Sequence, residues 1–135
     1  MKRTILLFCL AFISNILATV TIEGYVEVCE RCQYYATCGE IRAYSRETGG
    51  TVIDYCCISP NGFFTLEVSE NDTVWIEVYY AKHNFILPPG SLCARYSEWK
   101  SSERIQVITG TSDIELDVCA DDWEDVPSTG YHCGC

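Results

Sequence analysis

The chain has 135 residues, with 9 Lys and Arg against 19 Asp and Glu, so its formal net charge at pH 7 is −10. Such an acidic chain is unsuited to binding nucleic acid or anionic membrane surfaces, and it suits cations or basic partners without requiring them. The length is sufficient for one domain with its own hydrophobic core.

Residues 1–18 are typical of a secretory signal. Lys2 and Arg3 precede an apolar run over 5–13, and Ala18 is a small residue before the expected cut. The apolar run is too short to span a bilayer, which takes about 20 residues. We therefore expect a cleaved signal peptide, a secreted, extracellular protein and no membrane insertion.

Ten cysteines occur in the chain, and Cys9 lies within the expected signal. Nine remain, a density that in an exported protein predicts a disulfide framework. An odd number means that one thiol stays free, or bonds to a second chain or to a small thiol. The disulfide candidates are Cys29, Cys32, Cys38, Cys56, Cys57, Cys93, Cys119, Cys133 and Cys135.

Two-residue alternation of apolar side chains predicts seven short strands. They are expected over 19–28 and 40–46, then three within 51–80 separated by turns at 59–62 and 70–72, then over 104–109 and 113–119. Gly24, inside the first of these strands, indicates a bulge or the close approach of another backbone.

The segment 82–102 breaks the alternation and contains Pro88-Pro89-Gly90, so we expect a long ordered loop with a short helical turn near 96–100. No amphipathic helix is visible elsewhere. The pattern predicts an all-β, seven-strand antiparallel β-sandwich over 19–119 and an acidic, cysteine-containing tail over 120–135.

Ile22-Glu23-Gly24-Tyr25-Val26 is similar to the I-x-G-x-V that opens prealbumin-like (transthyretin-like or carboxypeptidase-regulatory-like) domains. Ser59, Gly62 and Phe64 stand at the D, G and F positions of the D-x-x-G-x-F turn in those domains. The resemblance covers residues 20–80. It implies a secreted sandwich that serves as a non-catalytic binding or structural unit.

The stretch from Gly24 to Cys32 also resembles the G-x-V-x-C-x-x-C of olive-pollen-allergen-like extracellular domains, with one extra residue before the first cysteine. Cys29-x-x-Cys32 alone could form a redox pair or half of a metal site, with Cys133-x-Cys135 and His132 as the second half. A redox pair is expected at the start of a helix, and here all-β patterns flank it. Structural disulfides are therefore the preferred reading.

Cys56 and Cys57 are adjacent at the end of a predicted strand, so their side chains point to opposite faces. We expect them to bond to two different partners, one inside the sandwich and one outside. A disulfide between the two neighbours is the alternative.

Motifs for catalysis are lacking. His83 and His132 lie outside any nucleophile or metalloprotease pattern, and no glycine-rich phosphate loop occurs. The acidic run over 113–125 lacks the loop pattern of a calcium site. We expect no enzyme activity, no metal and no cofactor. A thiol-redox enzyme is the least favoured alternative.

Several aromatic residues alternate with the predicted core and are expected on outer faces: Tyr25, Tyr44, Phe63, Trp75 and Tyr79. They either pack beneath loops or form a contact surface. Phe63, Trp75 and Tyr79, with Trp99 from the 82–102 loop, are our candidate contact residues for an extracellular protein, a glycan or a matrix component.

Two further features bear on assembly and modification. Asn71-Asp72-Thr73 is an N-glycosylation sequon in a predicted turn, and enzymatic deglycosylation would reveal a glycan there as a loss of mass. The odd cysteine supports an alternative function, in which the protein is a structural component that forms a disulfide-linked homodimer.

Overall fold

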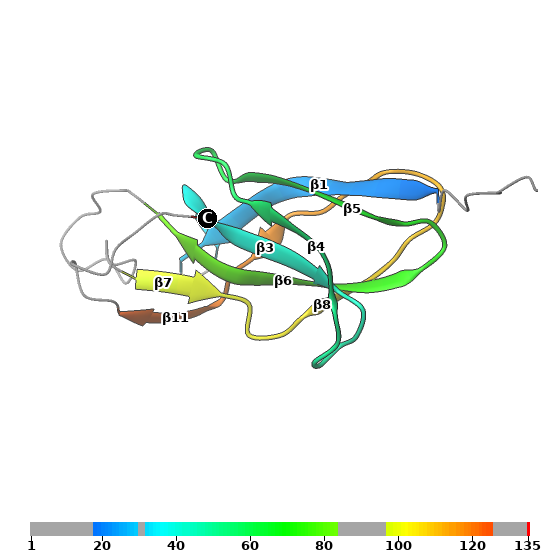
Figure 1. Ribbon diagram of the computed structural model, residues 1–135. Helices are drawn as coiled ribbons and strands as arrows, with labels where there is room; N and C mark the ends of the chain where they lie inside the picture. Colours follow the sequence, from blue (N-terminus) through cyan, green and yellow to red (C-terminus); the bar gives the residue numbers. More distant parts are fainter. Residues whose placement is uncertain (1–17, 30–31, 84–96, 126–134) are drawn as a thin grey trace, which may run out of the picture.

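The computed structural model describes residues 18–29, 32–83, 97–125 and 135 (Figure 1). These residues form eleven strands in two sheets. The strands are β1 (Thr19–Val28), β2 (Tyr34–Tyr35), β3 (Cys38–Tyr44), β4 (Val52–Cys57), β5 (Phe63–Ser69), β6 (Thr73–Lys82), β7 (Ser97–Lys100), β8 (Ile105–Ile108), β9 (Ile114–Glu115), β10 (Val118–Cys119) and β11 (Asp122–Asp125). The expected signal peptide lies outside this part of the chain, apart from Ala18.

The first sheet is built around β1. β5 pairs antiparallel with it from Thr19↔Ser69 to Tyr25↔Phe63, and β2 pairs with its last two residues. β9 and β10 run parallel to β1, with Glu23 opposite Glu115 and Val26 opposite Val118. The sequence predicted antiparallel strands only, and this is wrong for the first sheet, which is mixed. The parallel pairs arise because the chain crosses from the second sheet to the first between β8 and β9.

The second sheet has the order β11-β7-β6-β3-β4, and β8 also pairs with β6. Its neighbouring strands pair antiparallel throughout. Figure 1 shows β1 and β5 in one layer and β3, β4 and β6 in the other. The predicted all-β sandwich is confirmed at this level.

The hydrophobic core lies between the two sheets. Alternate residues of β1, β5, β3 and β6 point inward, among them Ile22, Phe64, Ile41 and Ile76, each with no exposed side-chain surface. Full burial of one such side chain contributes about 1.5 to 3 kcal/mol. The alternation read from the sequence thus identified the inward rows correctly.

The predicted helical turn near 96–100 is wrong, because Ser97–Lys100 is strand β7 and pairs with β11 in the expected tail. Trp99 lies opposite Trp123 in that ladder, and the two rings stack with their centroids 5.8 Å apart. Trp99 is only 1% exposed. The extended backbone inserts this ring into the core, an arrangement that the polar neighbours of Trp99 in the sequence concealed.

Disulfides connect the ends of the sandwich. Cys32–Cys119 joins the β1–β2 connection to β10, and Cys57–Cys135 joins the end of β4 to the last residue. They close segments of 87 and 78 residues, and in the chain-entropy model loops of this length are worth about 4 to 5 kcal/mol each. Cys29 and Cys38 are also disulfide-bonded. The predicted disulfide framework is confirmed, while Cys93 and Cys133 lie outside the described residues.

The prediction that Cys56 and Cys57 bond to different partners is confirmed for Cys57 and wrong for Cys56. Cys57 is exposed and bonded to Cys135, whereas Cys56 packs against the core and is the free cysteine of the described part. No disulfide joins the two neighbours. The predicted partner inside the sandwich is therefore absent for Cys56. In addition, no helix among the described residues is long and apolar enough to cross a membrane.

Gly24 marks the closest approach between β1 and the β9–β10 connection, as the sequence predicted. A Cβ atom at this position would clash with the carbonyl group of Leu116, whose amide in turn donates to the Glu23 carbonyl at 2.9 Å. We expect Gly24→Ala to lower the free energy of unfolding by about 1 to 3 kcal/mol, since backbone cannot move aside as a flexible side chain can. Denaturant unfolding of the oxidised protein measures this.

Gly110→Ala is the matched control, because a Cβ at Gly110 meets no atom within 4 Å. Unfolding midpoints that coincide for the two variants would contradict a close backbone contact at Gly24.

Candidate binding surfaces

The four predicted contact residues do not lie together. Phe63 is on the outer face of the first sheet, and Trp75 and Tyr79 are on the outer face of the second. Trp99 is buried and leaves the set of surface candidates. The rest of the candidate loop, over 84–96, is outside the described residues. The structure therefore offers two separate surfaces, one on each side of the sandwich.

The first surface carries a row of three rings, Tyr35, Tyr25 and Phe63, which we name the aromatic row. The ring centroids of Tyr25 and Tyr35 are 5.1 Å apart, and those of Tyr25 and Phe63 are 5.6 Å apart. Tyr25 is 36% exposed and Tyr35 is 49% exposed. Tilted and edge-on contacts of this kind are the preferred geometry of aromatic pairs.

Strand register produces the aromatic row. Tyr25 lies directly opposite Phe63 on β5, and Tyr35 pairs with Glu27, two residues further along the same face of β1. Directly opposite and diagonal neighbours are within reach of large side chains. Gly62, with φ of 86°, leaves room for Tyr35, because a Cβ there would lie 2.9 Å from the Tyr35 Cβ.

The sequence placed Tyr25 and Phe63 on outer faces but gave no signal for Tyr35. Strand β2 has only two residues, and two residues are too few to show an alternation.

Beside the aromatic row is a hollow of about 550 Å³ lined by acidic and aromatic residues. The lining residues are Glu23, Gly24, Tyr25, Phe63, Glu115, Leu116 and Asp117. Asp117 is held in place by the Tyr25 amide, which donates to its Oδ1 at 3.0 Å. Asp113 accepts from the Thr21 amide at 2.9 Å in the same way. These two aspartates satisfy β1 amides that lie just before the parallel pairs with β9 and between the pairs with β9 and β10.

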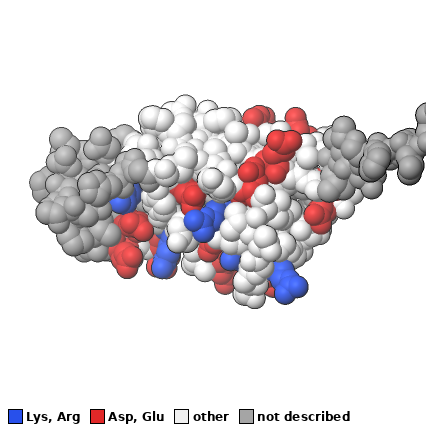
Figure 2. Space-filling view, viewed as in Figure 1, with Lys and Arg blue, Asp and Glu red and all other residues white. Residues whose placement is uncertain are grey.

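Basic side chains are confined to the second sheet and its connections in the described part of the chain. Their ion pairs are Arg42–Glu40 at 2.6 Å, Lys82–Glu98 at 3.7 Å, Lys100–Asp122 at 3.8 Å and Arg104–Glu77 at 3.6 Å. In Figure 2 the basic side chains in view lie among acidic ones and form no patch of their own. The outer face of the first sheet has no described cation to offset its carboxylates.

The second surface is centred on Arg42 and Tyr79. The Arg42 guanidinium lies over the Tyr79 ring, 3.5 Å from its centroid, and pairs with Glu40. Burial alone would lower the pKa of Arg42, but hydrogen bonds with Tyr44 and Glu40 and the Glu40 charge outweigh it and raise the pKa. Tyr79 is 49% exposed and lies at a register shift, between the pairs Glu40↔Tyr80 and Ile41↔Val78. Arg42, the cation over this ring, is already paired within the protein.

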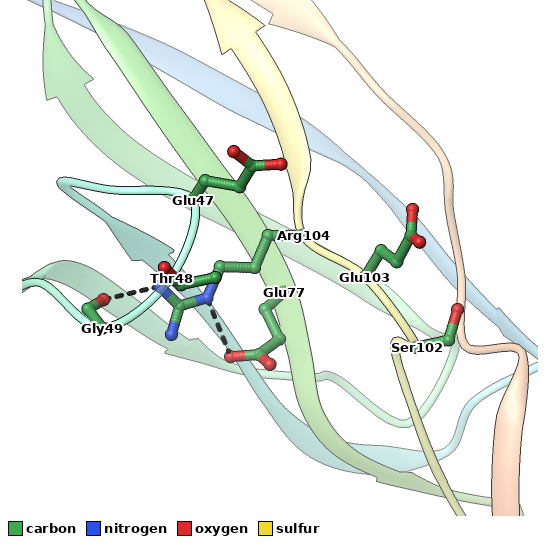
Figure 3. Close-up of a pocket in the computed structure, with 7 residues that line it drawn as sticks. All are labelled: Glu47, Thr48, Gly49, Glu77, Ser102, Glu103 and Arg104. Atoms are coloured by element: carbon green, nitrogen blue, oxygen red, sulfur yellow. Dashed lines mark hydrogen bonds and ion pairs between the residues drawn. The ribbon is translucent and has the colours of Figure 1, made fainter.

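Arg104 forms a latch at the edge of the same sheet (Figure 3). Its Nη1 donates to the carbonyls of Arg46 at 2.9 Å and Gly49 at 2.6 Å, and its Nε lies 3.6 Å from a Glu77 oxygen. The guanidinium also lies 3.5 Å from the centroid of the Tyr44 ring. With its donors occupied in this way, Arg104 holds the β3–β4 turn in place.

A hollow of about 470 Å³ adjoins the latch, lined by Glu47, Thr48, Gly49, Glu77, Ser102, Glu103 and Arg104. Figure 3 shows the Arg104 side chain directed at Gly49 and Glu77. Tyr44 is on the outer face of β3, as predicted, but it is only 7% exposed because Arg104 lies over its ring, so it follows the alternative in which an outer ring packs beneath another part of the chain. Burial raises the pKa of the Tyr44 hydroxyl, and Glu77 raises it further against the opposing effect of Arg42. The hollow thus adjoins a structural contact.

The described residues contain no group of side chains arranged for metal binding or for thiol redox chemistry. No cluster of three or more His, Cys, Asp or Glu side chains there is placed to hold a metal ion. Cys32 is bonded to Cys119, so the two cysteines of the Cys29-x-x-Cys32 motif are not joined to each other. His83 is completely buried, and His132 lies outside the described part. His83 is therefore not available on an open surface.

No protein-family model, no curated protein and no solved structure matches the chain. The aromatic row and its acidic hollow are therefore the features from which a function is argued.

The latch predicts a stability difference between two substitutions. Arg104→Ala removes two charge-assisted hydrogen bonds, an ion pair and a ring contact, and we expect it to lower the free energy of unfolding by about 2 to 3 kcal/mol. Arg104→Lys should recover less than half of this, because a single ammonium cannot contact the two carbonyls and Glu77 at once, and it lacks the planar group that lies over the Tyr44 ring. Denaturant unfolding compares the three proteins, and a lysine variant as stable as the parent would contradict the latch.

Proposed function

We propose that this chain is a secreted, disulfide-stapled β-sandwich of prealbumin-like type that binds an extracellular protein, glycan or matrix component without catalysis. The signal-like segment 1–18 and the disulfides support export to an oxidising compartment. Asn71 is exposed in the β5–β6 turn, so the sequon there is accessible, and its glycosylation stays a prediction.

The aromatic row is the observation that carries this proposal. Large rings such as Phe64 and Trp99 are buried where they serve the core. Tyr25 and Tyr35 instead remain 36% and 49% exposed in contact with one another. Aromatic side chains are enriched in protein interfaces and supply much of their binding energy. A contiguous row on the outer face of a sheet is well suited to contact a partner.

A binding assay on deposited extracellular matrix and cell surfaces tests this function. We expect the labelled, oxidised protein to show saturable binding. The double variant Tyr25→Ser, Phe63→Ser should bind about tenfold more weakly, because aromatic side chains commonly supply much of the binding energy of an interface. Binding of the labelled protein at serial concentrations gives the apparent Kd.

The matched control is Tyr55→Ser, Ile108→Ser, which removes two side chains that are 62% and 74% exposed on the second sheet. It should bind as the parent does. Equal loss in both double variants, or no binding by the parent, would contradict the proposal.

Assembly through the odd cysteine is a second candidate, favoured by the free thiol of Cys56. This thiol is half-buried, packs against the core and lies 3.1 Å from the Cys57 carbonyl oxygen. A disulfide with a second chain would require the end of β4 to move outward. The binding function therefore ranks above assembly.

Electrophoresis with and without reductant separates the two candidates. We expect the monomer mass in both lanes, because the Cys56 thiol faces inward. A doubled mass that disappears on reduction and in Cys56→Ser would favour covalent assembly instead. The serine variant keeps the size of the side chain, so loss of the dimer would report the thiol itself.

A further inference from the structure

Three carboxylates surround the aromatic row, and we name Glu23, Glu27 and Glu115 the carboxylate rim. Glu23 and Glu27 flank Tyr25 at two residues' distance on the same face of β1, and Glu115 lies directly opposite Glu23. None of the three forms an ion pair within the described part of the chain. Asp113 and Asp117 differ from these three, because each accepts a hydrogen bond from a backbone amide of β1.

Rings and carboxylates together form a site for cations. The face of an aromatic ring attracts ammonium and guanidinium groups, and nearby carboxylates add to that attraction. In the second sheet the protein itself fills such a position, where Arg42 lies over Tyr79 and pairs with Glu40. On the first sheet the same combination of groups lacks a cation in the described residues.

We infer that the aromatic row and the carboxylate rim bind an extended segment of a partner protein that carries Arg or Lys residues. This inference rests on the proposed binding function and specifies the chemistry of the partner. A neutral glycan could stack on the rings but would leave the carboxylates without opposite charge, and an anionic one would be repelled.

The spacing of the rim suits an extended chain. Residues on one face of a strand recur about every 6.6 Å, so Glu23 and Glu27 are about 13 Å apart along β1. Basic residues at positions i and i+4 of an extended segment have the same spacing. The residue at i+2 would then lie over Tyr25. The partner motif is accordingly a basic residue at each end of a five-residue stretch with an apolar residue in the middle.

Three labelled peptides test this motif against the full oxidised chain by fluorescence anisotropy. The first has the core Arg-Thr-Val-Thr-Arg, the second has Gln in place of both Arg, and the third has both Arg adjacent at one end. We expect the first to bind about tenfold more tightly than the second, because the charges are lost, and about threefold more tightly than the third, because the spacing is lost. Equal affinity for all three would overturn the inference.

Protein variants separate this site from general attraction to an acidic protein. Glu115→Lys and Glu124→Lys change the net charge equally, but Glu124 is exposed on β11 of the second sheet. We expect Glu115→Lys to weaken binding of the first peptide about tenfold at physiological salt. Glu124→Lys should weaken it less than about twofold, because distant charges are screened. Equal weakening would show non-specific attraction and overturn the site.

The ring itself is tested by Tyr25→Leu, which keeps an apolar side chain and removes the aromatic face. About fivefold weaker peptide binding is expected. Tyr35→Leu is a second variant that tests the row if Tyr25→Leu unfolds. Peptide affinity unchanged by a folded leucine variant would overturn the role of the rings.

The outcome for this inference is separate from that for the proposed function. If matrix binding depends on Tyr25 and Phe63 but the three peptides are not distinguished, the surface binds a partner of other chemistry and only this inference fails. If matrix binding is absent and the peptides are not distinguished, both fail.

Discussion

Backbone pairing along β1 is the constraint on which the arrangement of this molecule depends. One edge of the strand pairs with β5 and β2, and the other with β9 and β10, so segments from four parts of the chain are aligned by one backbone. Register then fixes the side-chain faces, since a shift by one residue would exchange them. In the observed register Ile22 and Val26 face the core, and Glu23, Tyr25 and Glu27 consequently face outward. The core and the candidate surface are thus two consequences of the same pairing.

The sequence predicted those features that depend on alternation and on local backbone geometry. The strand over 19–28, the turn at 59–62 and the tight approach at Gly24 all follow from side-chain period or from glycine. It failed where a short strand is defined by its partner. Tyr34–Tyr35 and Ser97–Lys100 carry no periodic pattern, and they are strands because β1, β6 and β11 present unpaired backbone to them. The candidate site needed Tyr35, so only part of it could be foreseen.

Trp99 illustrates the same limit in energetic terms. Its neighbours Glu98 and Lys100 made an exposed ring the natural expectation, yet in a strand adjacent side chains point to opposite faces. Lys100 pairs with Asp122 on the outside while Trp99 packs inside against Trp123. Burial of so large a ring stabilises the fold, although its Nε1 has no hydrogen-bond partner among the described residues. The polarity of a residue's neighbours in the sequence therefore does not predict its burial unless the segment is known to be a strand.

Stability and binding make different demands on the two outer faces. On the second sheet, Arg42 and Arg104 each contact a tyrosine ring and a carboxylate, so the charges of that face are largely balanced within the protein. On the first sheet, the aromatic pairs add about 0.5 to 1.5 kcal/mol each to strand pairing, by the usual scale for such contacts. The carboxylates beside them contribute no such gain, and like charges as close as Glu23 and Glu115 oppose folding. A face that retains this cost is better explained by a cationic partner than by the requirements of the fold.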